Sequence, residues 1–247
     1  MGEQNLAGKV VLVTGANSGI GKATALQLAR EGATTILACR DLAKARQAEE
    51  EIRRVSGNDA VSLVEPDLGD LRSVERCASE VIARTDGIDV VINNAGATYR
   101  SRVLTPQGFE QTSAVNYLGH YVLTRLLLHH FRREPQARVI SVSSNGHNFA
   151  GGIRWNDLTF ERSYSTTTAY ANAKLAQVLF TRELAHRQSE AGVFAHAVHP
   201  GFVGSDFYKS SGSGLAAMVW LLGTQQADQP VEGGYRRRLG EAALGAQ

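Results

Sequence analysis

Short runs of β-branched and apolar residues recur along the chain, and longer segments with the hydrophobic period of a helix separate them. Several of these runs are apolar without alternation, which is typical of strands buried on both faces. The runs predict strands at residues 10–14, 34–38, 60–65, 89–93, 138–143 and 193–199. The longer segments predict helices at residues 20–31, 41–55, 71–84, 109–131 and 169–189.

Strand and helix alternate throughout, and this order requires crossover connections that produce a parallel sheet covered by helices on both faces. We therefore predict an α/β fold, a Rossmann-type doubly wound parallel sheet of six or seven strands. No repeat or low-complexity linker divides the chain, so residues 1–247 are expected to form a single domain. Ligands of this architecture bind at the carboxyl ends of the strands, which makes the residues after each strand the functional candidates.

Composition and charge restrict the class of partner. The formal net charge of +2 is too close to balance to indicate nucleic acid or an anionic membrane. The two cysteines, Cys39 and Cys77, are too few for a disulfide framework and lack metal-ligand spacing, so we expect a reducing compartment and no metal site. The N-terminus lacks a signal-peptide pattern, and no apolar run approaches the roughly 20 residues of a membrane-spanning helix. A cytoplasmic location without a membrane span is expected.

A glycine-rich turn follows the first predicted strand and leads directly into a helix. Between Thr14 and Gly21 the sequence is Thr-Gly-Ala-Asn-Ser-Gly-Ile-Gly. Glycines let the backbone approach a pyrophosphate without a Cβ in the way, and the free N–H groups of the helix start attract that anion. The spacing differs from the commonest dinucleotide fingerprint, so a tight turn without a ligand is the alternative. The candidate dinucleotide contacts are Gly15, Asn17, Ser18, Gly19, Ile20 and Gly21.

The end of the second predicted strand selects the dinucleotide. An acidic residue there holds the ribose hydroxyls of NAD, whereas an arginine accommodates the 2′-phosphate of NADP. Cys39 occupies the place of the acid, and Arg40 follows it. A guanidinium binds phosphate through a bidentate fork, so NADP(H) is expected to be preferred over NAD(H). Asp41 is interpreted as a helix N-cap, and a solvated strand end is the alternative for Arg40.

Two further segments fit the same pocket. Asp67 and Leu68 follow the third predicted strand, where an acid can hydrogen-bond an adenine amino group. A helix cap is an equal alternative for Asp67. Asn93, Ala95 and Gly96 follow the fourth strand, and the small residues would let the backbone lie against the cofactor.

Tyr170 and Lys174 lie four residues apart in the last helical segment, so their side chains project from one face of the helix. A free tyrosine has a pKa near 10 and is a poor base at neutral pH. A neighbouring ammonium favours the phenolate, so the phenol can donate or accept a proton near neutrality. As a bare pattern the pair is a weak signal, because most such pairs are ordinary surface neighbours.

Taken together, these motifs resemble the short-chain dehydrogenase/reductase superfamily. The resemblance covers nearly the whole chain in the family's order, through residues 14–21, 93–96, Asn116, Ser144, Tyr170, Lys174 and 200–201. Within the superfamily, residues 14–21, 37–41, 115–121 and 198–201 resemble the retinol-dehydrogenase-like branch, which generally prefers NADP(H).

The resemblance implies a role for each of four residues. Tyr170 is the general acid in carbonyl reduction and the base in alcohol oxidation. Lys174 lowers the tyrosine pKa and hydrogen-bonds the nicotinamide ribose, and Asn116 anchors a water in a proton relay to Lys174. Ser144, rather than Ser143 or Ser141, hydrogen-bonds the substrate oxygen. The resemblance also places Pro200, Gly201 and Val203 against the cofactor.

The resemblance further places a substrate lid at residues 202–224, whose Ser-Gly run and apolar residues predict a mobile segment over an apolar ligand. The long interval from Asn145 to Ala169 is expected to form a wall above the site. We expect a medium to large hydrophobic carbonyl or alcohol as substrate, either retinal-like, steroid-like or polyketide-like. The family implies a homodimer or tetramer, although the final edge strand of its relatives is not found in this sequence.

Two other functions are consistent with a bound dinucleotide. One is an NADP(H)-binding regulator that senses redox state without turnover. The other is a tailoring epimerase or dehydratase on the same scaffold. Retention of Asn116, Ser144, Tyr170 and Lys174 argues against the sensor, because a sensor needs only the phosphate turn.

Overall fold

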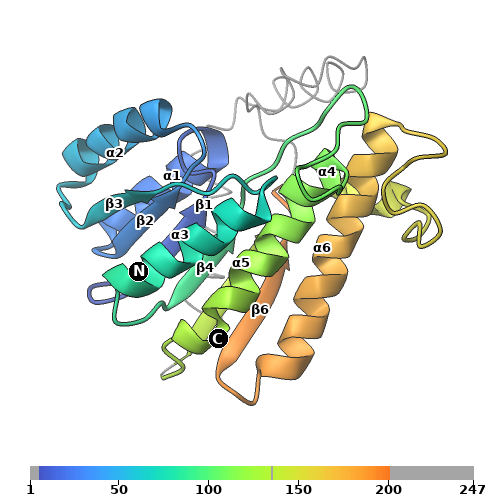
Figure 1. The fold of residues 1–247 in the computed structure, drawn as a ribbon. Helices are drawn as coiled ribbons and strands as arrows, with labels where there is room; N and C mark the ends of the chain where they lie inside the picture. Colours follow the sequence, from blue (N-terminus) through green and yellow to red (C-terminus); the bar gives the residue numbers. More distant parts are fainter. Residues whose placement is uncertain (1–5, 135, 201–247) are drawn as a thin grey trace.

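A computed structural model describes residues 6–134 and 136–200 of the chain. Their strands form one parallel sheet in the order β3-β2-β1-β4-β5-β6 (Figure 1). Each strand lies within one residue of its predicted ends, so the predicted Rossmann-type sheet is confirmed, with six strands in the described part. The strands are β1 (Val10–Thr14), β2 (Thr34–Ala38), β3 (Val61–Val64), β4 (Val90–Asn93), β5 (Ala137–Val142) and β6 (Val193–Val198).

Helices cover both faces of this sheet, as Figure 1 shows. One face packs on α1 (Gly19–Arg30) and α2 (Leu42–Ser56). The other packs on α3 (Leu71–Arg84), α5 (Gly119–Leu127) and α6 (Thr166–Gln188).

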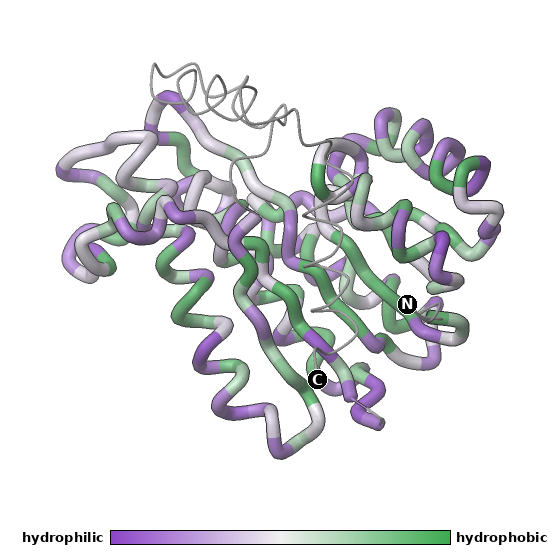
Figure 2. Tube along the Cα trace, turned by 180° about the vertical axis from the view of Figure 1, so that it is seen from behind, coloured by the Kyte–Doolittle hydropathy of each residue, from purple (hydrophilic) through white to green (hydrophobic). Residues whose placement is uncertain are grey.

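Alternate strand residues enter the two cores. Val11 and Val13 of β1 belong to the core with α1 and α2, whereas Val10 and Leu12 belong to the opposite core. Figure 2 shows the central strands hydrophobic along their length, while the helices alternate between hydrophobic and hydrophilic stretches. Burial on both faces therefore explains why these strands carry no alternating pattern.

The predicted continuous helix at 109–131 is wrong. The segment consists of α4 (Gln111–Ser113), the π-helical turn η1 (Ala114–Leu118), α5 and the 3-10 turn η2 (Leu128–His130). Asn116 accounts for the wide turn, because its Nδ2 donates to the Thr112 carbonyl at 2.7 Å and to the Ala97 carbonyl at 2.6 Å. A side chain that bonds to a helical carbonyl and to a neighbouring loop interrupts the regular main-chain hydrogen bonds of the helix at that turn.

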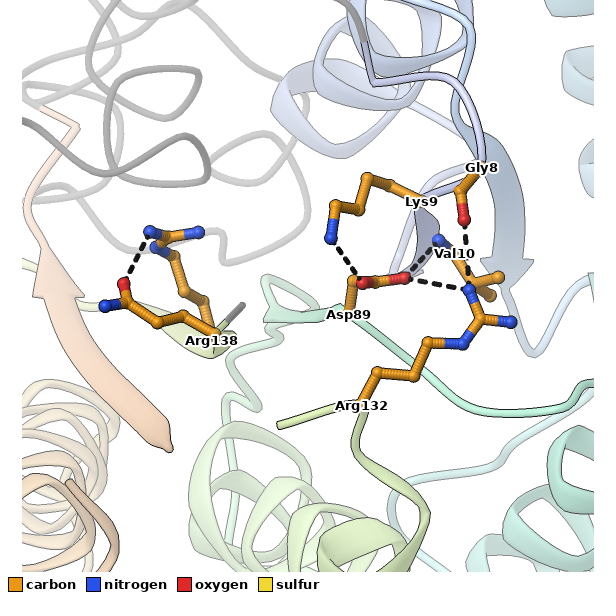
Figure 3. Close-up of polar contacts among 7 residues, drawn as sticks. Gly8, Lys9, Val10, Asp89, Arg132 and Arg138 are labelled. Carbon is orange, nitrogen blue, oxygen red and sulfur yellow. Dashed lines mark hydrogen bonds and ion pairs between the residues drawn. The ribbon is translucent and has the colours of Figure 1, made fainter. Parts of the chain in front are cut away.

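A buried carboxylate fastens the amino-terminal edge of the sheet, far from the carboxyl ends of the strands. Asp89 accepts hydrogen bonds from the Val10 N–H at 2.8 Å, from Lys9 Nζ at 2.9 Å and from Arg132 Nη1 at 3.3 Å (Figure 3). Its side chain is only 3% exposed. The cluster joins β1 to the start of β4 and to the segment after η2, so its role is structural.

The strand order reverses at β1 and β4. The chain passes from β1 outward to β2 and β3, then returns to β4 on the other side of β1 and continues outward to β5 and β6. The connections after β1 and β4 therefore leave in opposite directions, which opens a crevice between their carboxyl ends.

Candidate active site

The turn between β1 and α1 is shaped by its glycines. Gly15 and Gly19 have φ values of +67° and +52°, which side chains rarely adopt. A Cβ on Gly15 would lie 2.9 Å from the Ala95 Cα, and one on Gly21 would collide with the Gly15 carbonyl and lie 2.5 Å from Asn94 Nδ2. These two glycines are therefore also required by the close packing of the turn against the end of β4, a reason that the sequence did not reveal.

The start of α1 presents main-chain donors to the crevice. Its N-cap, Ser18, makes no hydrogen bond from its side chain to the first turn of the helix. The N–H groups of that turn have no intrahelical acceptors, and they carry the positive end of the helix dipole. Such a terminus is suited to a phosphate or pyrophosphate.

A polar network ties the ends of β1 and β4 together beneath this turn. The Thr14 hydroxyl accepts the N–H groups of Asn94 and Ala95, each at 2.9 Å, and Asn94 Nδ2 donates to the Thr14 carbonyl at 2.8 Å. Thr14 Oγ1 also lies 2.9 Å from His120 Nε2 on α5. His120 is fully buried, and desolvation, together with the Lys174 charge, lowers its pKa to about 3. A neutral imidazole therefore packs beneath the crevice between β1 and β4, in contact with Thr14.

Arg40, Lys44 and Asp67 gather at the end of β2. Arg40 Nη1 lies 3.9 Å from Asp67 Oδ1, and Lys44 Nζ lies 3.1 Å from Asp41 Oδ2. Arg40 and Lys44 are 63% and 70% exposed, so these pairs are weak and both cations are available to an anionic ligand. Cys39 beside them is buried, and burial raises the pKa of its thiol to about 11, so the position where NAD enzymes hold an acid is uncharged.

Aspartates cap both helices that begin at this end of the site, α2 and α3. Asp41 is the N-cap of α2 and accepts the Lys44 N–H, as predicted. The cap of α3 is Asp70, not Asp67. Asp67 accepts the Gly69 N–H at 2.9 Å instead and lines the pocket.

Ser144 and Tyr170 approach each other across Gly146. Ser144 follows β5 as the N-cap of the 3-10 turn η3 (Asn145–Phe149), and its Oγ accepts the Gly146 N–H at 3.1 Å. A Cβ on Gly146 would lie 3.2 Å from Tyr170 Cε1 and 3.4 Å from Ser144 Oγ. The missing side chain at 146 therefore lets the phenol ring and the serine hydroxyl share one corner of the pocket.

Lys174 lies one turn beyond Tyr170 on α6. Its Nζ is 5.8 Å from the centroid of the Tyr170 ring. The ammonium donates to the Val142 carbonyl at 2.7 Å and to Gln177 Oε1 at 3.0 Å. Desolvation lowers the pKa of this lysine to about 7. A lysine so affected changes its charge in the physiological pH range, which is unusual outside functional sites.

A pocket of about 510 Å³ joins these groups. It runs from the cations at the end of β2, past the α1 terminus and the end of β4, to Ser144, Tyr170 and Lys174. Most of the residues predicted from the sequence line this pocket. They are Gly15, Asn17, Ser18, Gly19, Ile20, Gly21, Arg40, Asp67, Leu68, Ala95, Gly96, Ser144, Tyr170, Lys174 and Pro200. Gly201, Val203 and the predicted lid at 202–224 lie outside the described residues.

Two predicted residues do not line the pocket. Asn93 is buried at the end of β4, and its Nδ2 donates to Thr124 Oγ1 at 3.0 Å. Asn116 is also buried, and its Oδ1 accepts the Ala97 N–H at 3.3 Å while its Nδ2 is used in the η1 turn. Its main-chain carbonyl lies 3.3 Å from His120 Nδ1. Its side chain reaches the site only indirectly, through its bonds to Ala97, which lines the pocket.

Sequence reasoning missed several residues of the site. Lys44 was detectable, because it lies one helical turn after the cap Asp41 and is a cation near Arg40. Gly146 and Gln177 gave no sequence signal, since their importance depends on contacts between distant segments. Asn94, within the predicted segment 93–96, also lines the pocket. The other missed residues line the pocket, and they are Ala38, Cys39, Asp41, Pro66, Ala97, Tyr99, Val115, Val142 and Ser143.

No residue of the segment 145–169 lines the pocket, so its role as a wall above the site stays a prediction. Tyr164 and Thr166 donate from their hydroxyls to the Tyr99 carbonyl at 2.7 and 2.9 Å, and Tyr99 lines the pocket. Arg102 Nε donates to the Thr159 carbonyl at 2.7 Å. These bonds join the segment to the loop that follows β4.

A family model described as short chain dehydrogenase matches residues 9–215. The chain belongs to this family. Among curated relatives, this short-chain dehydrogenase is 43% identical to retinol dehydrogenase 12 of Mus musculus, over 88% of its own chain and 68% of the relative. It is 41% identical to retinol dehydrogenase 13 of Homo sapiens, with the same two coverages. The resemblance to the retinol-dehydrogenase-like branch is thereby confirmed.

Solved structures agree with this assignment. An uncharacterised protein from Mycobacterium paratuberculosis is 40% identical, with a TM-score of 0.71 over 90% of this chain and 76% of the other. A protein described as an NAD(P)-dependent gluconate 5-dehydrogenase from Beutenbergia cavernae, with bound NADP, is 28% identical. Its TM-score is 0.70 over 92% of this chain and 82% of the other. In residues 6–134 and 136–200, this short-chain dehydrogenase has no helix long and apolar enough to cross a bilayer.

The pocket of this short-chain dehydrogenase fits a nicotinamide dinucleotide. The glycine turn and the uncapped α1 terminus provide donors for a pyrophosphate, and the cations at the end of β2 lie at one extremity of the pocket. The hydroxyls of Ser144 and Tyr170 lie at the other extremity. The arrangement separates an anion-binding end from an end with proton-transfer groups.

Proposed function

We propose that this protein is an NADP(H)-dependent oxidoreductase that interconverts a carbonyl and an alcohol on a medium to large hydrophobic substrate. The observation that carries the proposal is the meeting of Ser144, Tyr170 and Lys174 in the pocket that also contains the α1 terminus. A sensor of the dinucleotide has no need of a buried lysine beside a phenol, because burial of an ammonium costs free energy.

Each side chain has a role that follows from its chemistry. The Ser144 hydroxyl donates a hydrogen bond to the substrate oxygen and fixes its position beside the Tyr170 phenol. In reduction Tyr170 gives its proton to that oxygen, and in oxidation it takes the proton from the hydroxyl. The Lys174 ammonium favours the ionised phenol. A bound nicotinamide supplies the hydride to the carbonyl carbon, or accepts it from the alcohol carbon.

The preference for NADP(H) rests on the end of β2. Arg40 and Lys44 are exposed cations that line the pocket, and Cys39 provides no carboxylate for the ribose hydroxyls. A phosphate on the 2′-oxygen would gain charge-assisted hydrogen bonds at this place. A solved relative described as NAD(P)-dependent contains bound NADP, which supports binding of NADP by this fold.

The hydrophobic substrate is supported by two observations. The curated relatives are named for retinol, a large apolar alcohol. Tyr99 and Val115 add apolar surface to the pocket lining.

The experiment is steady-state oxidation of NADPH and NADH by the full chain against a panel of carbonyls, from small polar aldehydes to retinal and steroid ketones. We expect turnover with NADPH and a kcat/KM that increases with the apolar size of the carbonyl. Tight NADPH binding without reduction of any carbonyl would favour the redox sensor. A preference for small polar carbonyls would contradict the proposed substrate class.

A further inference from the structure

Two oxygen atoms from different elements hold the Lys174 ammonium. One is the Val142 carbonyl at the end of β5, and the other is Oε1 of Gln177, one turn further along α6. Lys174 is 4% exposed and Gln177 is 1% exposed. These two acceptors therefore replace most of the hydration that an ammonium has in water.

The orientation of the Gln177 amide is determined from both sides. An ammonium has only donors, so the amide must turn its oxygen toward Lys174. Its Nε2 then faces the Asn93 carbonyl at 3.5 Å, at the end of β4. The Gln177 main-chain carbonyl accepts the Thr181 hydroxyl at 2.8 Å. Gln177 thus connects the lysine to the strand end that borders the cofactor pocket.

Among the side chains that fit this space, an amide stabilises the charged form of Lys174 to an intermediate degree. A buried ammonium needs hydrogen-bond acceptors, and burial already lowers the pKa of Lys174 to about 7. A carboxylate of the same shape would strengthen the charged form by an ion pair. An apolar side chain of similar volume would remove an acceptor and weaken the charged form.

Other ionisable groups face α6 from the elements packed on it. His120 on α5 is kept neutral by its pKa of about 3, so it adds no charge beside Lys174 in the neutral range. On α6 itself the neighbouring ionisable group is Tyr170. The remaining groups on or beside elements packed against α6 are Glu110, Tyr117, Tyr121, Arg138, His147 and His196.

We infer that Gln177 is a positioning residue that holds the Lys174 ammonium toward the pocket and determines how strongly it remains charged beside Tyr170. The catalytic consequence rests on the proposed function, whereas the contact between the two side chains does not.

The test compares the full-length wild type with Gln177→Glu and Gln177→Met, two replacements of similar size. In protein carrying ¹³C-labelled lysine, the Cε resonance of Lys174 is titrated and identified by its loss in Lys174→Met. We expect the midpoint to rise by about one pH unit or more in Gln177→Glu and to fall by about one unit in Gln177→Met. Thr35→Val is the matched control, because it removes a hydrogen bond from a buried hydroxyl without touching Lys174 or Gln177.

The pH profile of kcat/KM for alcohol oxidation gives the second readout. Gln177→Met leaves the ammonium less charged beside the phenol, so its acidic limb should move to higher pH, while Thr35→Val keeps the wild-type profile. Equal titration midpoints of Lys174 in wild type and both variants would overturn the inference. If Gln177→Met does not fold, the midpoint in Gln177→Glu alone decides. Shifted midpoints with an unchanged limb would support the positioning role and contradict the proton-transfer role in the proposed function.

Discussion

The Nζ of Lys174 lies 5.8 Å from the centroid of the Tyr170 ring, one turn away on the same helix, α6. The spacing of four residues places both side chains on one face of α6, and packing against β5 and η3 turns that face toward the pocket. The relationship brings a phenol beside a lysine that is 4% exposed, and burial of the cation strengthens its influence on a neighbouring group.

Replacement of Tyr170 by Phe should abolish turnover and spare the dinucleotide. Loss of the proton donor is expected to reduce kcat by about 100-fold to 10,000-fold, the usual contribution of general acid–base catalysis. Dinucleotide affinity, measured by fluorescence titration, should remain within about threefold of wild type, since the ring stays in place. Tyr117→Phe is the matched control, because Tyr117 packs on Tyr121 and Phe180 away from the pocket lining. Hydride transfer at the wild-type rate in Tyr170→Phe would refute the assigned role.

Replacement of Arg40 by Ala should weaken NADPH selectively. A charge-assisted hydrogen bond contributes about 1.5–3 kcal/mol, so the Kd for NADPH should rise by about 10-fold to 100-fold while that for NADH stays nearly constant. Isothermal titration with both dinucleotides measures the ratio. Arg46→Ala, an exposed arginine on α2 outside the pocket, is the control. An equal loss for the two dinucleotides would show that Arg40 does not read the 2′-phosphate.

Replacement of Gly146 by Ala should disturb the corner shared by Ser144 and Tyr170. The new methyl would lie 3.2 Å from Tyr170 Cε1, so the ring must move by a few tenths of an ångström. We expect kcat to fall by about 10-fold with unchanged dinucleotide affinity, since small misplacements of reacting groups are costly. Gly151→Ala is the control: its Cβ meets no atom within 4 Å, and its φ of +63° costs stability only. A wild-type kcat in Gly146→Ala would contradict the close approach.

Removal of His120 should flatten the acid dependence of stability. The pKa of His120 is about 3 in the folded protein and 6.5 ordinarily, so below pH 6.5 the unfolded chain binds a proton that the native state rejects. Its contribution to stability is therefore complete above pH 6.5 and is lost as the pH falls toward 3. In His120→Gln, the slope of the unfolding free energy between pH 6 and pH 4 should decrease by up to about 1.4 kcal/mol per pH unit.

Urea unfolding at a series of pH values measures this slope. His129→Gln, at an exposed histidine, is the matched control. An identical slope in His120→Gln and wild type would mean that the buried imidazole is not linked to folding in this way.

Replacement of Asp89 by Asn should destabilise the protein without altering the pocket. The carboxylate is 3% exposed and joins Lys9, Val10 and Arg132 (Figure 3). Its two cations are about one-third exposed, so we expect a loss of about 2–3 kcal/mol, below the usual cost of breaking a fully buried ion pair. Chemical unfolding measures the loss. Gln136→Ala, which removes a hydrogen bond to the Arg138 side chain, should change stability by less than about 0.5 kcal/mol.

The chain's own pattern was sufficient for the strands, the helix-rich connections and the location of the site. The strands are buried on both faces and lie between clear turn signals, so their apolar runs are distinct from the helical segments. Because parallel strands bring their carboxyl ends to one edge, the order of the elements along the chain was enough to assign the residues after β1, β2, β3 and β4 to one pocket. The pair Tyr170 and Lys174 was equally accessible, since both members lie on one helix.

The tertiary structure alone decided the features that depend on contacts between distant segments. The interruption of the helix at Asn116 arises because its side chain bonds to Ala97, nineteen residues away in sequence. Gly15 and Gly146 are needed because Ala95 and Tyr170 approach them closely. The acceptors of the Lys174 ammonium come from β5 and from a glutamine with no sequence motif. Local periodicity indicates which face of an element is buried, but it does not indicate which atoms are in contact there. Those contacts determine the charge of Lys174 and the position of the phenol.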